Sequence, residues 1–148
     1  MKIAIYSRGI ENNQHQDIVR LLDELALSGV ELVFYQDFFN QFYSAIDLKA
    51  KYSTFNSSKD LDQNIDFIIS LGGDGTLLDT VTLVKDSGIP VAGINYGRLG
   101  FLANIGKEDL VTAVEALVNR TFVLDQRTLI HLDANTSLFG DAPYALNE

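Results

Sequence analysis

The sequence predicts an α/β fold: a doubly wound parallel-sheet domain over residues 1–119, followed over residues 120–148 by the opening strands of a β-rich domain. Three observations predict it. Short apolar runs alternate with amphipathic helical segments up to residue 119, the helical pattern disappears after residue 121, and a glycine-rich turn joins a buried strand to a helix. The opening β-α-β unit requires a parallel pair of strands with a right-handed crossover.

The first elements form that β-α-β unit. Residues 2–7 are an apolar run of strand length, and residues 30–35 are a second one. Between them, residues 14–28 predict a helix that ends at Gly29. Its apolar residues recur at helical spacing: Ile18, Leu21, Leu22 and Leu25.

The next segment is less regular. Residues 37–48 are expected to be helical, residues 51–59 are polar and expected to form a loop, and residues 65–71 predict a buried strand. The aromatic residues of this helix are expected in the core or at a subunit contact: Phe38, Phe39, Phe42 and Tyr43.

A helix is predicted after the glycine-rich turn, ending at Gly88, with four residues on one face: Leu77, Leu78, Val81 and Val84. Residues 90–95 predict the next strand and residues 96–100 a turn, and residues 107–119 form the clearest helix. Beyond it the sequence predicts three strands and one loop: strands at residues 121–124, 128–132 and 144–146, and a loop at 135–141.

Composition limits the classes of function. The chain is 47% hydrophobic, which suits a packed core, and its formal net charge of −9 argues against a nucleic-acid scaffold. It has no cysteine, which excludes disulfides and thiolate metal sites. No signal-peptide layout opens the chain, and its apolar runs are shorter than a membrane span, so a soluble cytoplasmic protein is expected.

The strongest functional signal is the sequence Gly72-Gly73-Asp74-Gly75-Thr76, between a buried strand and an amphipathic helix. Open parallel sheets bind ligands at the carboxyl ends of their strands. Glycines let backbone N–H groups approach a phosphate, and the helix start adds its positive end. A carboxylate beside phosphates is unfavourable unless it takes a proton from an attacking hydroxyl or holds a magnesium ion.

A purely structural interpretation is also available. Asp74 and Thr76 could cap the helix while the glycines form a tight turn. The glycines on both sides of Asp74 favour the functional interpretation. The motif is neither a Walker A loop nor the G-x-G-x-x-G fingerprint. The first turn of the chain, after Ser7, also lacks that fingerprint, which argues against a redox enzyme of the dinucleotide-binding type.

Two further segments narrow the function. Residues 93–102 read Gly-Ile-Asn-Tyr-Gly-Arg-Leu-Gly-Phe-Leu, and the chain ends with Asn147-Glu148. The glycine-rich motif resembles the loop shared by NAD kinases, diacylglycerol and sphingosine kinases and, more distantly, phosphofructokinases. The other two segments resemble the NAD kinase pattern G-x-N-x-G-x-L-G-F-L and that family's Asn-Glu pair. The resemblance covers nearly the whole chain and identifies it as an N-terminal portion of a member of the NAD kinase family.

This resemblance implies a Rossmann-like or phosphofructokinase-like domain, ATP with Mg²⁺ as phosphoryl donor (or polyphosphate, as in some bacterial members), and a homo-oligomer. Asp74 would be the general base that acts on the 2′-hydroxyl of the adenosine ribose of NAD. Residues implied to bind NAD are Asp74, Gly75, Phe101, Asn147 and Glu148. The phosphate loop would consist of Gly72, Gly73, Gly75 and Thr76, and no protein ligand to a metal is assigned.

The remaining candidates have simpler explanations. Arg98 could offset phosphate charge, but a single arginine in a turn is more often a solvated residue. Phe101 and Leu102 could be either core or ligand wall. His15 is expected to be exposed and His131 has no partner ligand, so neither indicates zinc.

Two rival functions stay open at this point. A lipid kinase of the diacylglycerol or sphingosine type would share the Asp74 loop, and a non-catalytic nucleotide-binding module would bind NAD or ATP without transfer. Because family members continue into a β-rich domain that supplies further NAD-binding residues, the 148 residues alone are expected to have little or no kinase activity.

Overall fold

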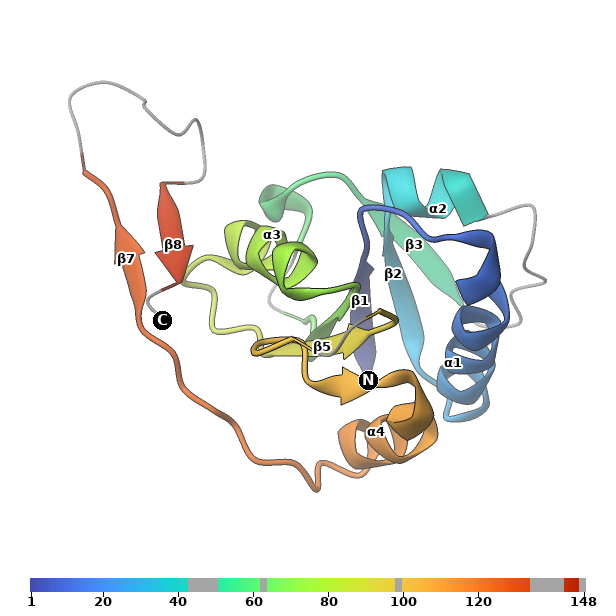
Figure 1. The fold of residues 1–148 in the computed structure, drawn as a ribbon. Coiled ribbons are helices and arrows are strands. Elements are labelled where there is room, and N and C mark those ends of the chain that lie inside the picture. Colours follow the sequence, from blue (N-terminus) through green and yellow to red (C-terminus); the bar gives the residue numbers. More distant parts are fainter. Residues whose placement is uncertain (43–50, 62–63, 98–99, 134–142, 147–148) are drawn as a thin grey trace.

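The computed structural model describes residues 1–42, 51–61, 64–97, 100–133 and 143–146 (Figure 1). These residues form a six-stranded sheet in the order β3-β2-β1-β4-β5-β6 and a separate two-stranded sheet of β7 and β8. The strands are β1 (Lys2–Tyr6), β2 (Glu31–Tyr35), β3 (Tyr52–Phe55), β4 (Phe67–Leu71), β5 (Val91–Asn95), β6 (Ile105–Gly106), β7 (Leu129–His131) and β8 (Tyr144–Leu146).

Every pairing in the larger sheet is parallel, whereas β7 and β8 are antiparallel. The helices are α1 (His15–Leu27), α2 (Gln36–Phe42), α3 (Asp74–Val84) and α4 (Leu110–Val118). Short 3-10 turns occur at Asn12–Gln14, Ser58–Asp60 and Lys107–Asp109. The predicted α/β fold with a parallel sheet is therefore confirmed.

The core lies on both faces of the sheet. Figure 1 shows α1 and α4 against one face and α3 against the other. Successive side chains of β1 pack on opposite faces of the sheet, since Ile3 packs with α1 and α4 while Ala4 packs with Val84 of α3. All five residues of β4 are buried, as expected for a central parallel strand covered on both faces.

The predicted loop at residues 51–59 is wrong for residues 52–55. Residues 52–55 form strand β3, which pairs in parallel with β2. β3 is an edge strand in which only Phe55 is buried, so its sequence lacks an apolar run. The ring of Tyr52 nevertheless packs against Phe34 and Phe39, at centroid distances of 6.4 and 5.2 Å. Aromatic and β-branched residues favour strands even where one face is solvated.

The predicted strand at residues 121–124 is also wrong. The structure has no strand there, and the side chain of Val123 is 96% exposed. β-Branched residues indicate a strand only if a neighbouring strand can complete the hydrogen-bond ladder, and no described strand pairs with this segment. The two-residue strand β6 was not predicted, because it is too short to produce a hydrophobic pattern.

Smaller differences concern single residues and element ends. Leu78 is 40% exposed rather than on the buried face of α3, because it lies about 100° around the helix from Leu77. His15 is half-buried instead of exposed, and its ring packs edge-on against Phe42 at 5.2 Å. The aromatic helix is confirmed for Gln36–Phe42 with Phe38 and Phe42 in the core, while Tyr43 lies outside the described residues.

Strands β7 and β8 pack against α3. Leu129 of β7 and Leu146 of β8 contact a small apolar cluster that includes Leu77 and Val81. This antiparallel pair agrees with the predicted change to β structure, and the boundary at residue 119 stays a prediction. Within the described ranges, no helix is both long and apolar enough to cross a membrane.

Candidate functional site

The candidate site lies where the chain changes direction across the sheet. β1 and β4 are neighbours, and α1 follows β1 onto one face while α3 follows β4 onto the other. The carboxyl ends of the two strands therefore diverge into loops that leave a crevice between them. In open α/β sheets this switch point is the usual place for a ligand.

A cavity of about 480 Å³ opens at this crevice, within the size range of sites for small molecules. Three segments line it at the carboxyl ends of the strands, and Gln41 of α2 closes one side. The lining residues are Gly9, Ile10, Glu11, Gln14, Gln41, Leu71, Gly72, Gly73, Asn95, Tyr96 and Gly97.

Several of these lining residues were not predicted from the sequence. Glu11 and Gln14 form a reciprocal capping box at the turn before α1, with the Gln14 side chain accepting from the N–H of Glu11 at 3.1 Å. The signal that could have found them is position: they follow β1, whose carboxyl end must lie beside that of β4 if the two strands are neighbours.

The glycine-rich turn leads directly into α3. Gly73 is the N-cap residue, and the first helical hydrogen bonds run from the N–H groups of Thr76 and Leu77 to its carbonyl, at 3.0 and 3.2 Å. The N–H groups of Asp74 and Gly75 precede these bonds and have no acceptor within the helix. They are available to an anion that approaches the turn.

The three glycines of the turn differ in what the fold demands of them. Gly72 has a φ of +149°, and a Cβ there would overlap the side chain of Thr76, whose Cβ would be 2.9 Å away. A Cβ on Gly73 would meet nothing within 4 Å, and one on Gly75 would meet only the flexible end of Arg8, at 3.3 Å. The fold thus requires glycine at 72 but has room for a side chain at 73 and 75.

Asp74 connects this turn to the segment that follows β5. Its Oδ1 accepts the N–H groups of Leu102 and Ala103 at 3.0 and 2.9 Å, and its Oδ2 accepts that of Phe101 at 2.9 Å. A Cβ on Gly100 would overlap the carboxylate, so glycine is required there too. We call this arrangement the Asp74 clamp.

The clamp keeps the carboxylate ionised. The N–H groups of Ala103, Phe101 and Leu102 stabilise the charged form and hold the pKa of Asp74 below its ordinary value. Asp74 does not cap α3: the N-cap residue is Gly73, and the carboxylate of Asp74 accepts N–H groups of residues 101–103 instead. The partners of Asp74 lie 27 to 29 residues away, so local sequence could not reveal them.

Asn95, at the end of β5, holds the start of the same segment. Its side chain is 4% exposed, its Nδ2 donates to the carbonyl of Ala103 at 3.4 Å, and its Oδ1 accepts the N–H of Gly97 at 2.8 Å. Gly93 is also required, because a Cβ would lie 2.9 Å from the Cα of Ala103. The segment's Asn and first Gly therefore have structural roles beside the site.

Phe101 is 97% exposed, so the core alternative for this residue is wrong. Leu102 is half-buried and packs against the cluster of Leu77 and Val81. The other candidates of these segments lie outside the described residues: Arg98, Leu99, Asn147 and Glu148.

The histidines do not form a metal site. His131 is exposed, and its ring lies 4.8 Å from that of Tyr144. Among the residues that the structure describes, no three His, Cys, Asp or Glu side chains come together as metal ligands. The carboxylate of Asp74 accepts three N–H groups and belongs to no such cluster of ligands.

Comparison with known proteins agrees with the sequence motifs. A family model described as the ATP-NAD kinase N-terminal domain matches residues 10–122. The chain is 36% identical to an NAD kinase of Flavobacterium johnsoniae over 150 residues, covering 100% of the chain and 51% of that protein. It is 31% identical to an NAD kinase of Bacteroides fragilis, covering 100% and 50%. The chain thus spans about half the length of the curated relatives it matches.

Two solved structures share the fold. The yeast NADH kinase complexed with NADH superposes with a TM-score of 0.73 at 17% identity, covering 99% of this chain and 46% of the yeast protein. An NAD kinase from Archaeoglobus fulgidus in complex with ATP gives a TM-score of 0.56 at 23% identity, covering 99% and 45%. The family match, the ordered motifs and the shared fold together show that the chain belongs to the NAD kinase family and carries its N-terminal domain.

Proposed function

We propose that this protein is an NAD kinase, which transfers the γ-phosphoryl group of ATP to the 2′-hydroxyl of the adenosine ribose of NAD to give NADP. One observation carries the proposal: Gly73 and Gly75 flank Asp74 at the switch point of the sheet, and the fold itself requires neither glycine. Glycines that packing does not explain are expected where a ligand approaches the backbone closely. The family match favours NAD as acceptor over a lipid.

In this proposal the phosphates lie on the turn. The N–H groups of Asp74 and Gly75 are not used by α3, and they point along the positive end of its dipole. The remainder of a nucleotide extends into the adjoining cavity of about 480 Å³. The cavity wall combines the apolar side chains of Ile10 and Leu71 with uncharged polar ones, and Glu11 is its one charged residue. A wall of this kind suits sugar hydroxyls and a base better than it suits phosphates.

Asp74 is proposed to receive the proton of the attacking hydroxyl. Its Oδ2 accepts one described N–H and keeps a second acceptor position, which a ribose hydroxyl can occupy. The lowered pKa makes Asp74 a weak base. Phosphoryl transfer has a loose transition state and depends mainly on positioning, so orienting the hydroxyl is the larger part of the proposed role.

Several elements of the proposal concern the whole protein. Mg²⁺ is proposed to arrive with the phosphates of the donor, where it would neutralise their charge. Phe101 is proposed to contact NAD, because an exposed phenylalanine beside the Asp74 clamp has no packing role. Asn147 and Glu148 are proposed to bind NAD, and the protein is proposed to be cytoplasmic and to form a homo-oligomer.

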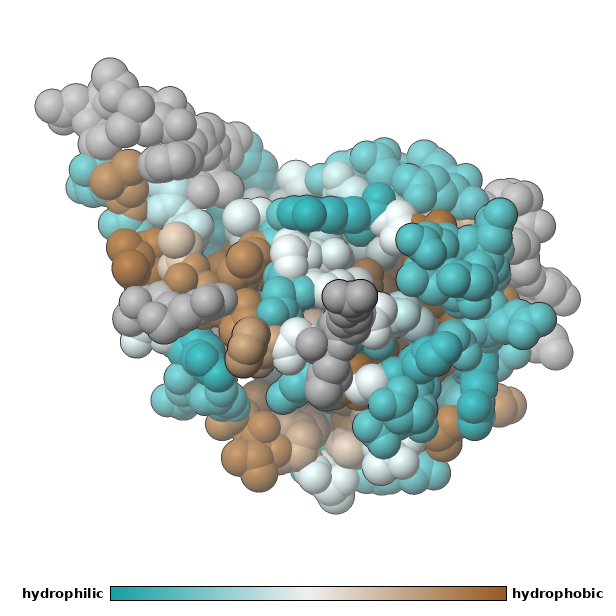
Figure 2. Space-filling model, viewed as in Figure 1, coloured by the Kyte–Doolittle hydropathy of each residue, from teal (hydrophilic) through white to brown (hydrophobic). Residues whose placement is uncertain are grey.

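We also propose that residue 119 ends the α/β domain and that residues 120–148 begin a β-rich domain. Exposed apolar side chains gather on the side of the molecule that carries β7 and β8 (Figure 2). Most of the large apolar side chains that are exposed come from α3 and the chain after it: Leu78, Phe101, Val123, Leu124, Ile130 and Leu132. Apolar surface of this kind supports a further domain or subunit packed there.

The direct test uses the polypeptide translated from the complete reading frame, which we call the full-length protein. It is incubated with NAD, ATP and Mg²⁺, and NADP is measured with an NADP-specific dehydrogenase. We expect NADP from the full-length protein and little or none from residues 1–148 alone. Nucleotide binding without any transfer would favour the non-catalytic module, and phosphorylation of diacylglycerol or sphingosine instead of NAD would favour the lipid kinase.

A further inference from the structure

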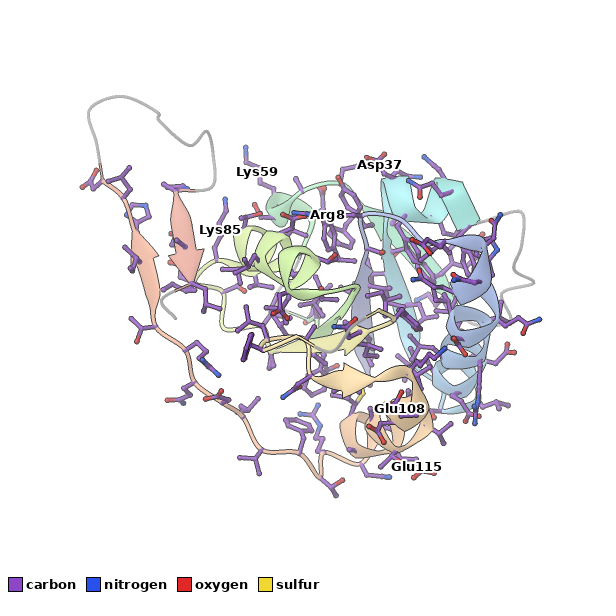
Figure 3. The ribbon with its side chains drawn as sticks, viewed as in Figure 1. Arg8, Asp37, Lys59, Lys85, Glu108 and Glu115 are labelled. Atoms are coloured by element: carbon purple, nitrogen blue, oxygen red, sulfur yellow. The ribbon has the colours of Figure 1, made fainter. Side chains whose placement is uncertain are left out.

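In the described part of the chain, the guanidinium group of Arg8 lies against the glycine-rich turn. Arg8 follows β1, so it leaves the sheet at the same edge as the turn after β4. Figure 3 shows its side chain reaching from the end of β1 toward α3. Its Nη1 would be 3.3 Å from a Cβ on Gly75, so the absence of a side chain at 75 opens the space between the cation and the turn.

A hydrogen-bonded pair holds the guanidinium in this place. Nε and Nη2 of Arg8 donate to the two carboxylate oxygens of Asp79, with Nη2 at 2.7 Å from Oδ1. The hydroxyl of Tyr6 donates to Asp79 Oδ2 at 3.0 Å. Arg8 keeps the pKa of Asp79 below its ordinary value, so the pair stays charged at neutral pH. Asp79 and Tyr6 therefore act as positioning residues for Arg8.

The ion pair with Asp79 leaves other N–H donors of Arg8 available. A bidentate fork with one carboxylate uses only part of a guanidinium, and the Nη1 side faces Gly75. The side chain is 60% exposed, so an incoming group can reach it. Stability alone gives little reason for the pair, because exposed ion pairs contribute little.

From this geometry we infer that Arg8 binds an oxygen of the phosphate chain seated on the glycine-rich turn. This inference rests on the proposed function. Nη1 of Arg8 lies beside Gly75, whose N–H group, like that of Asp74, precedes the first helical hydrogen bonds of α3. Arginine is well suited to phosphate oxygens. The ligand group is a short chain of phosphates: NAD carries a pyrophosphate and ATP carries a triphosphate.

The test measures affinities of the full-length protein for ATP, NAD, inorganic tripolyphosphate and adenosine by calorimetry, at low and high salt. The variants are Arg8→Ala, Arg8→Lys and Asp79→Asn. The matched control is Arg127→Ala, because Arg127 is also exposed and paired with an aspartate, Asp125, at 2.8 Å.

We expect Arg8→Ala to bind tripolyphosphate, and whichever nucleotide has its phosphates on the turn, about 10- to 100-fold more weakly. Adenosine binding should be unchanged, and the loss should shrink at high salt. Arg8→Lys should recover part of the affinity, Asp79→Asn should lose less than Arg8→Ala, and Arg127→Ala should match the parent protein. The nucleotide that responds identifies the source of the phosphates.

Two results would overturn the inference. The first is parental affinity of Arg8→Ala for tripolyphosphate and both nucleotides. The second is an equal loss in Arg8→Ala and Asp79→Asn that follows their loss of thermal stability, because a purely structural pair gives that result. In both cases NADP formation by the parent protein would leave the proposed function standing, whereas a parent that forms no NADP would refute that function separately.

Discussion

Separate substitutions of Gly72 and Gly73 should distinguish the glycine that the fold requires from the glycine that the ligand requires. Gly72→Ala places an L-residue at a φ of +149°, which costs about 1–3 kcal/mol. Its Cβ also overlaps Thr76, and overpacking costs about 1–3 kcal/mol. The lower entropy of the unfolded chain returns about 0.4–1 kcal/mol. We expect a net loss of about 1–5.6 kcal/mol in the free energy of unfolding.

Gly73→Ala should behave oppositely. Gly73 has φ −81° and ψ −170°, which alanine adopts freely, and its Cβ would meet no atom within 4 Å. Alanine is a poorer N-cap than glycine by about 0.5–1 kcal/mol, and the unfolded-state term offsets about the same amount. The free energy of unfolding should therefore change by less than about 1 kcal/mol.

The assay is urea unfolding of the full-length variants, followed by circular dichroism, together with calorimetric titration of ATP and NAD. Because the new methyl group of Gly73→Ala lies on the cavity wall, we expect it to weaken binding of at least one nucleotide by about tenfold or more. Equal destabilisation by the two substitutions, or parental affinity in Gly73→Ala, would refute the assignment of Gly73 to the ligand.

Four further predictions follow from single contacts. Asp74→Asn should speed amide hydrogen exchange at residues 101–103 even without ligand, because the Nδ2 of the new asparagine cannot accept the N–H of Phe101. Unchanged exchange would mean that the Asp74 clamp does not order this segment. In the unsubstituted protein the Asp74 clamp should be complete above the ordinary carboxyl pKa of about 4, and it should be lost as the pH falls through the lowered pKa of Asp74. The measurement is amide hydrogen exchange at residues 101–103 as a function of pH, and a loss of protection that begins near neutral pH would contradict this. Tyr96→Phe removes a buried hydroxyl that has no hydrogen-bond partner among the described residues, and it should leave the free energy of unfolding in urea unchanged or raise it by up to about 1 kcal/mol. Tyr6→Phe loses a hydrogen bond to Asp79 and should lower the free energy of unfolding by about 1–2 kcal/mol; the reverse order would show these hydroxyl environments to be wrong. Phe101→Ala should change stability by less than about 0.5 kcal/mol while raising the KM for NAD, and an unchanged KM would remove Phe101 from the NAD site.

The sequence predicted the central parts of the fold well because β1, β2, β4 and β5 are apolar runs that are buried on the sheet. It failed where structure depends on distant partners. Edge strand β3 has only Phe55 buried, and residues 121–124 have β-branched side chains but no partner strand among those described. Local pattern carries no information about whether a neighbouring strand is present.

In the candidate site, too, features with a local sequence signal could be predicted, and features that depend on distant residues could not. The position of Asp74 could be predicted, because a glycine-rich turn between a buried strand and a helix is a local signal. Its clamp on residues 101–103 and the fork between Arg8 and Asp79 join residues 27 to 71 positions apart, so only the folded chain reveals them. The motifs in the sequence likewise could not show that Gly72 is required by the fold while Gly73 faces the cavity.

The proposed reaction requires a sugar hydroxyl to contact the Asp74 carboxylate while phosphates lie on the turn that precedes α3. A crystal structure of the full-length protein with NAD and a non-hydrolysable ATP analogue measures this directly. We expect the adenosine ribose 2′-oxygen within hydrogen-bond distance of Asp74 Oδ2, and phosphate oxygens on the N–H groups of Asp74 and Gly75. Nucleotides bound elsewhere, with the Asp74 carboxylate contacting only residues 101–103, would contradict it.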